Sequence, residues 1–183
     1  NAGDSVWISY VGGSFKDVGW DLTIDTFGYI YCSGITETDN DPTTVGYTSA
    51  IRTWNTCQDY LGGGFDAYIE KFHPSGKRIF GTYYGGSGND GGVDAPDDML
   101  GLAVGANNDL FLGSYTTSTR GTGWAIPSSN GYKTAKAAGY DAFLVKFFQC
   151  KKFLKVSSNS PACLKDTIKF YVKDSADNTS LKK

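Results

Sequence analysis

An imperfect internal repeat limits the folds open to this chain more than any other feature. The run WISYVGGSFKD, residues 7–17, aligns with FGTYYGGSGND, residues 80–90, at an offset of 73 residues. Two further pairs of segments align at offsets of 80 and 75 residues: 24–36 with 104–116, and 65–72 with 140–147. Repeats of this length are typical of propellers, solenoids and other arrays of small units. The drift in offset places the insertions in loops, where such units tolerate them.

Each copy of the repeat is predicted to form four short strands. They are expected in the run that ends at the Gly-Gly pair, before Asp25 or Gly105, over 29–33 or 109–113, and over 66–72 or 141–147. Residues 66–72 alternate between two faces with the period of two expected of a strand. The 24 Gly residues and the 15% aromatic content suit tight turns between half-buried strands. No segment has a helical period, so the sequence predicts an all-β fold.

Turn chemistry separates the predicted strands. HPSGK, residues 73–77, is typical of a hairpin turn, with Pro fixing φ and Gly able to take a positive φ. Asn108 stands where the first copy has Gly28, and Asn tolerates positive φ. Most Asp residues also fall at repeated turns, where their side chains can cap neighbouring amides. The single His, His73, lies in such a turn, so the sequence favours a non-enzymatic chain.

The repeated segments resemble a known family. GGSGND, DTFGYIYCSGIT, GFDAYIEKFHPSG and GYDAFLVKF, which lie between residues 6 and 148, resemble the SBBP family of β-propeller repeats. The resemblance implies two four-stranded propeller blades from a secreted cell-surface protein of Bacteroidetes, similar to type IX secretion cargo. It also implies propellers of about seven blades, so the two copies are expected to be a fragment of a larger propeller.

A domain boundary is expected near Cys150. Residues 150–183 hold eight Lys against three Asp, whereas the rest of the chain is net acidic. We therefore expect propeller repeats over 1–149, and a linker with the start of a second domain over 150–183. The segment 156–172 resembles the opening strands of Ig-like or PKD-like modules. The acidic main body argues against nucleic acid as a partner, and no stretch reaches the roughly 18 apolar residues that suggest a membrane span.

One acidic stretch is a candidate metal site. It offers oxygen ligands suited to Ca²⁺, a hard cation that takes six to eight of them. The candidate ligands are Asn89, Asp90, Asp94, Asp97 and Asp98. Their spacing does not match an EF-hand, and the alternative is a solvated acidic loop. No other cofactor is expected.

The four Cys residues suggest two disulfide bridges. Cys32 and Cys57 both belong to the first copy and are both absent from the second, which suggests a pair in an oxidising compartment. The alternative is two reduced, buried thiols. Cys150 and Cys163 flank the expected domain boundary, and the rival interpretation is that Cys163 pairs with a strand beyond this chain.

Aromatic residues in the long loops are candidate sugar contacts. Trp54 and Trp124, with Tyr47 and Tyr60, lie between predicted strands. Aromatic rings stack on sugar rings, but large aromatics in loops more often pack the loop onto the fold.

The expected function is that of a non-enzymatic structural or adhesive module, extracellular and at the cell surface. Its expected partners are other domains of the same chain, surface proteins, polysaccharide or further copies of itself. Two alternatives are a carbohydrate-binding module of a secreted hydrolase and a subunit of an extracellular filament or complex, since exposed sheet edges invite strand addition.

Overall fold

The structure is a computed structural model of the 183-residue chain, and it describes residues 3–39, 51, 57–92, 100–119, 136 and 139–147. The regular secondary structure in these ranges consists of β-strands alone, which confirms the all-β prediction. The strands are β1 (Asp17–Ile24), β2 (Ile30–Thr36), β3 (Asp66–Phe72), β4 (Arg78–Tyr84), β5 (Gly101–Val104), β6 (Leu110–Thr116) and β7 (Asp141–Phe147).

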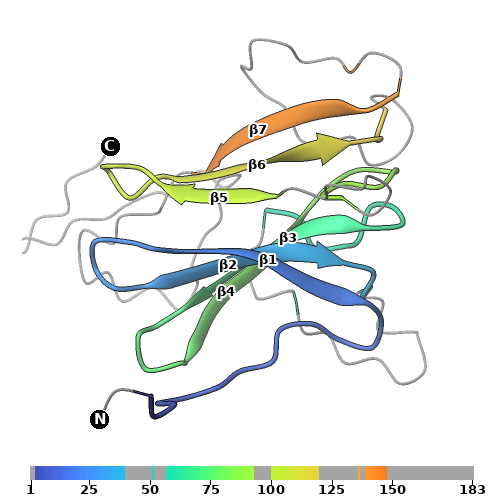
Figure 1. Ribbon diagram of the computed structural model, residues 1–183. Coiled ribbons are helices and arrows are strands. Elements are labelled where there is room, and N and C mark those ends of the chain that lie inside the picture. The colour runs from blue at the N-terminus through green and yellow to red at the C-terminus, as the bar shows by residue number, and fades with distance from the viewer. Residues whose placement is uncertain are drawn as a thin grey trace, which may run out of the picture.

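The strands form two antiparallel sheets in which chain neighbours are also sheet neighbours. Sheet 1 has the order β1-β2-β3-β4, and sheet 2 has the order β5-β6-β7. Figure 1 shows them as two stacked layers, with sheet 2 above sheet 1. The expected Ig-like segment, residues 150–183, lies outside the described residues.

The strand that ends at the Gly85-Gly86 pair belongs to sheet 1. β4 pairs with β3 from Ala67 opposite Tyr84 to Lys71 opposite Phe80. The predicted hairpin turn forces this pairing, because His73 N donates to the Lys77 carbonyl (2.8 Å) and Gly76 has a φ of 84°. The sequence repeat therefore begins one strand before the structural unit.

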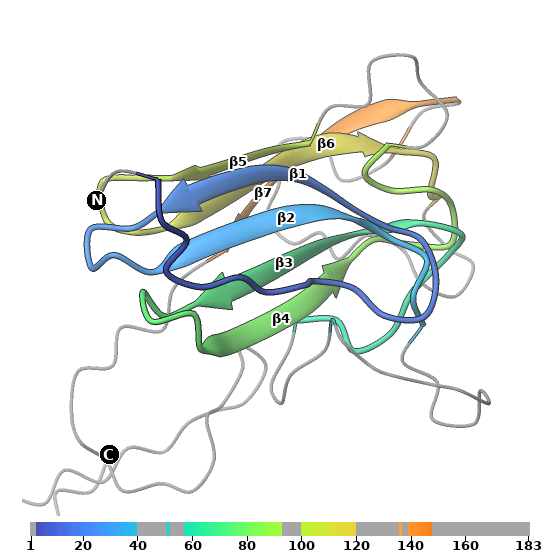
Figure 2. The same ribbon diagram turned by 60° about the horizontal axis from the view of Figure 1, so that its bottom comes forward.

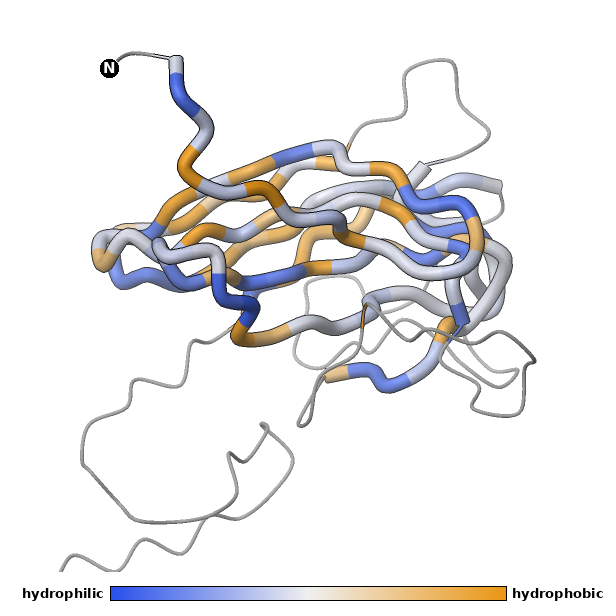
Figure 3. The backbone as a smooth tube through the Cα atoms, turned by 90° about the horizontal axis from the view of Figure 1, so that it is seen from below, coloured by the Kyte–Doolittle hydropathy of each residue, from blue (hydrophilic) through white to orange (hydrophobic). Residues whose placement is uncertain are grey.

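The aligned segment of the first copy, Trp7–Val11, forms no strand, so the strand expected there is wrong. It runs across the face of sheet 1 that points away from sheet 2, as Figures 2 and 3 show. Trp7 stacks on Phe72 at 6.3 Å between ring centroids, and its Nε1 donates to the Pro74 carbonyl (3.0 Å). Val11 packs on the buried pair Tyr68 and Tyr83.

The turns between β1 and β2 and between β5 and β6 are equivalent. Gly28 N donates to the Asp25 carbonyl (2.9 Å), and Asn108 N donates to the Gly105 carbonyl (2.8 Å). Gly28 has a φ of 81° and Asn108 a φ of 61°. Asn108 therefore replaces the turn glycine in the left-handed region, as predicted from its tolerance of positive φ.

The core lies between the two sheets. We call the two faces of each sheet the trailing face and the leading face. The trailing face carries Ala67 and Ile69 in sheet 1 and the aligned Ala142 and Leu144 in sheet 2. The leading face carries Tyr68 and Glu70 in sheet 1 and the aligned Phe143 and Val145 in sheet 2. The trailing face of sheet 1 packs on the leading face of sheet 2, and the buried cluster comprises Tyr31, Ala67, Ile69, Tyr84, Leu100, Leu102, Leu110 and Leu112. Burial of one such Leu side chain is worth about 2 kcal/mol, so this contact is a main source of stability.

Candidate functional site

The repeated Asp residues each accept a hydrogen bond from the second glycine of a Gly-Gly pair. Asp17 Oδ2 accepts from Gly13 N (2.7 Å), and Asp90 Oδ2 accepts from Gly86 N (2.6 Å). A short carboxylate side chain satisfies a nearby turn amide in this way. These two Asp residues therefore have a structural role in the turns.

Hydroxyl groups from the end of the second strand complete both Asp sites. Thr38 Oγ1 donates to Asp17 Oδ2 (3.1 Å), and Thr36 Oγ1 donates to Asp17 Oδ1 (2.5 Å). In the second copy, Ser118 Oγ donates to Asp90 Oδ2 (2.6 Å). These partners were not predicted from the sequence, although the offset of 80 residues that aligns the strands also aligns Thr38 with Ser118.

A junction joins the sheets at the Gly85-Gly86 pair, and it comprises Gln58, Asp66, Gly85, Gly86, Asp90 and Ser118. Asp66 begins β3 of sheet 1, and its Oδ2 accepts from Gly62 N (2.7 Å) and Gln58 Nε2 (2.8 Å). Gln58 Oε1 in turn accepts from Gly85 N (2.9 Å). The backbone of Asp90 forms an isolated antiparallel β-bridge with Thr116, the last residue of β6 in sheet 2.

Glycine is required at position 85 for the junction to close. A Cβ atom there would lie 2.3 Å from the Asp66 carboxylate carbon, far inside van der Waals contact. The chain therefore passes directly over the Asp66 side chain, and any larger residue would push the two apart.

The junction holds two carboxylates away from solvent. Asp66 and Asp90 are both fully buried, and the Oδ1 atom of each has no hydrogen-bond partner among the described residues. Burial raises the pKa of Asp66 to about 8, and the negative charge of Asp90 adds to the shift. Asp66 therefore titrates near neutral pH, which makes the junction sensitive to protons.

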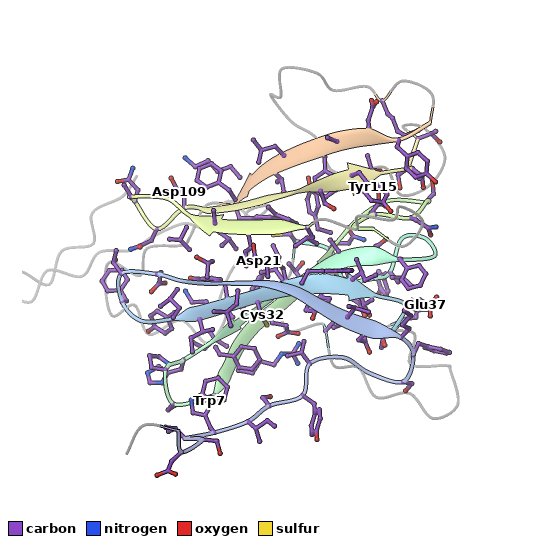
Figure 4. All side chains as sticks on the ribbon, in the orientation of Figure 1. Trp7, Asp21, Cys32, Glu37, Asp109 and Tyr115 are labelled. Atoms are coloured by element: carbon purple, nitrogen blue, oxygen red, sulfur yellow. The ribbon has the colours of Figure 1, made fainter. Side chains whose placement is uncertain are left out.

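A second repeated feature pairs a lysine with an acid at the far end of each sheet. Lys71 Nζ lies 3.7 Å from Asp25 Oδ2 and 4.7 Å from the centre of the Tyr31 ring. In sheet 2, Lys146 Nζ lies 2.7 Å from Asp109 Oδ2, and Figure 4 labels Asp109 at the turn between β5 and β6. Sheet 2 has Gly105 in place of Asp25, so the acid has moved to another turn position and the pair is retained.

The candidate calcium ligands are only partly described. Asn89 Oδ1 accepts from Phe65 N (3.3 Å), and Asp90 is occupied in the junction. Asp94, Asp97 and Asp98 lie outside the described residues. No group of three or more His, Cys, Asp or Glu residues in the described ranges is placed to hold a metal ion. Calcium binding stays a prediction.

The expected bridge between Cys32 and Cys57 is absent from the structure. Cys32 is a free thiol on the leading face of β2, labelled in Figure 4. Burial raises its pKa to about 11, with a further contribution from the charge of Glu70. Cys57 lies beyond the edge of β4, where its N donates to Thr82 Oγ1 (3.1 Å) and the Gln58 carbonyl accepts from Tyr83 N (3.4 Å).

Strand spacing explains why these two thiols do not meet. β3 and β4 lie between β2 and the edge that Cys57 follows, and each strand adds about 4.8 Å. A disulfide joins Cα atoms less than about 7 Å apart. Cys150 and Cys163, the second expected pair, lie outside the described residues.

Other candidate residues are mostly outside the described ranges. Trp54, Trp124 and Tyr47 are not described, and Tyr60 is partly exposed. His73 Nδ1 lies 2.8 Å from Ser75 Oγ within its own turn, which is the arrangement expected of a turn residue.

Comparison with known proteins gives no family. No protein-family model matches the sequence, and no curated protein matches it either. In the described ranges, no helix has the length and apolar character needed to cross a membrane.

Proposed function

We propose that this chain is a non-enzymatic structural or adhesive module of a secreted cell-surface protein, in which stacked sheets provide a surface for binding or assembly. The SBBP resemblance supports the secreted, propeller-like setting. The structural roles of Asp17 and Asp90 support a non-enzymatic chain, because the repeated acids hold turns.

One comparison between aligned residues carries the proposal. Ile69, on the trailing face of sheet 1, is 1% exposed, whereas the aligned Leu144 of sheet 2 is 77% exposed. Leu102, on the leading face of sheet 2, is 6% exposed, whereas the aligned Leu22 of sheet 1 is 59% exposed. Part of each half of the contact thus recurs exposed on an outer face: Leu144 on sheet 2, and Leu22 at the β1 edge of sheet 1, while Trp7–Val11 covers the part of the leading face formed by β3 and β4.

Two outer faces with complementary chemistry favour repetition of the same contact. Leu144 gives the trailing face of sheet 2 the character of a surface that packs on a leading face, and Leu22 gives the β1 part of the leading face of sheet 1 the character of its partner. Large apolar groups left in water favour association. The partners that fit are another sheet of the same protein or a second copy of this chain.

The test is self-association of the purified chain, measured by sedimentation over a wide concentration range. Leu144→Asp and Leu22→Asp are each expected to weaken association by about tenfold or more, because burial of one Leu is worth roughly 2 kcal/mol. Phe27→Asp is the matched control, since Phe27 is an exposed apolar residue in a turn. A chain that stays monomeric throughout, with no difference between the variants, would contradict the proposal.

A further inference from the structure

We propose that Trp7–Val11 is a donor strand, which pairs with β7 of a second copy of this chain and completes its sheet 2. This inference rests on the proposed assembly role and names the partner and the contact.

The internal repeat identifies the segment as a fourth strand. Trp7–Val11 aligns with Phe80–Tyr84, which lies within β4 and pairs with β3. β7 aligns with β3, and sheet 2 has no described strand beyond β7. The chain therefore carries both a sequence of the fourth-strand type and a sheet whose described part stops at three strands.

The segment lies on sheet 1 in a state suited to release. It belongs to no strand ladder in the described part of the chain, and two of its apolar side chains point into solvent, with Ile8 81% and Tyr10 95% exposed. Tyr83, which aligns with Tyr10, is fully buried, and its hydroxyl donates to the Thr38 carbonyl (2.6 Å). Tyr10 is thus the exposed equivalent of a core residue.

The register of β4 on β3 fixes how the donor strand would lie. Transferred to β7, it places Tyr10 opposite Phe143 and Ile8 opposite Val145. Phe143 and Val145 pack against the core between the sheets, so Ile8 and Tyr10 would extend that apolar surface. The Tyr10 hydroxyl would then reach the carbonyl of Ser118, the equivalent of Thr38.

The transfer also reproduces the junction. In the structure, Asp90 follows β4 and lies beside Asp66 at the start of β3. Asp17 follows the donor segment with the same spacing and would lie beside Asp141, at the start of β7 of the second copy. Both the strand and the turn that follows it therefore match the position beyond β7.

Hydrogen exchange of the full chain, in dilute and concentrated solution, tests the pairing. Amides of Trp7–Val11 and of β7 are both expected to exchange at least about tenfold more slowly in the concentrated sample, because strand pairing protects them. Ser9→Pro removes an amide that would face β7 and should abolish this protection. Ser9 aligns with Thr82, whereas Ile8 and Tyr10 align with Gly81 and Tyr83, and the Tyr83 amide points away from β3 toward the Gln58 carbonyl. Asp4→Pro is the matched control, since Asp4 lies just outside the residues that align with β4.

The outcomes separate this inference from the proposed function. If Leu144→Asp and Leu22→Asp weaken association and Ser9→Pro does not, the donor strand is wrong and stacking of the sheets stands. If β7 is protected in dilute solution while Trp7–Val11 exchanges freely at every concentration, another segment of the same chain fills the edge and the inference is overturned. Thermal unfolding of Ser9→Pro should match the parent in dilute solution.

Discussion

Asp66 shows how one buried carboxyl can make the contact between two sheets depend on pH. Its side chain is held by Gly62 and Gln58 but has Asp90 as a neighbour and no described partner for Oδ1. A group whose pKa is raised by folding, here from 3.8 to about 8, binds more protons in the folded state than in the unfolded state. Its contribution to stability is therefore complete below the unfolded pKa and is lost as the pH rises through the folded pKa.

Asp66→Asn is expected to flatten this pH dependence. The parent should lose stability between pH 4 and 8, the range given by the two pKa values. The variant has no proton to lose at this position and should keep only the part of the slope that comes from Glu70, whose pKa burial also raises to about 8. Urea denaturation at a series of pH values measures the slope. Asp4→Asn, at an exposed position, is the control and should keep the slope of the parent. An Asp66→Asn variant with an unchanged slope would assign the pH dependence to another group.

The sequence predicted the strands better than it predicted how they pair into sheets. The alternation in residues 66–72 and the turn at 73–77 were sufficient to find β3 and the hairpin that follows it. The strand that ends at the Gly85-Gly86 pair was assigned to the second copy, whereas β4 belongs to sheet 1. The assignment was wrong because a sequence repeat can be divided at any point along its period. The local hairpin, and not the alignment, determines which strands pair.

The candidate site was less predictable for a related reason. Asp17 and Asp90 were visible as repeated turn acids, but Gln58 comes from a region without a described equivalent in the second copy. The pair formed by Glu70 and Arg78 was also invisible, because the second copy has Val145 in place of Glu70. Buried polar partners depend on tertiary contacts that neither period nor composition records.

Arg78→Ala is expected to lower the free energy of unfolding by about 3 kcal/mol, because it leaves the buried Glu70 carboxyl without its charged partner. Arg78 forms an ion pair with Glu70, whose side chain is almost fully buried, and its Nη2 also donates to the Ile51 carbonyl (2.5 Å). Replacement of both partners, with Glu70→Val as in the second copy, should recover most of the loss. Urea denaturation of the single and double variants measures this; a double variant no more stable than Arg78→Ala would contradict it.

For the whole molecule, aligned leucines provide an internal comparison of the stacked and the outer faces. Leu102→Ala should cost about 3 kcal/mol, because it opens a cavity between the sheets. Leu22→Ala, at the equivalent position on the outer face, should change the stability of the monomer by less than about 0.5 kcal/mol. Denaturation of both variants in dilute solution measures the difference, and equal losses would mean that the outer face is already covered.

The contact between unlike faces gives the arrangement a polarity. A sheet that packs its trailing face on the next leading face cannot form a symmetric face-to-face dimer through that contact. Repetition of one such step gives a closed ring when the rotation per sheet divides a full turn, and an open helical filament when it does not. The angle between the two sheets therefore determines the stoichiometry of any larger assembly built on this contact.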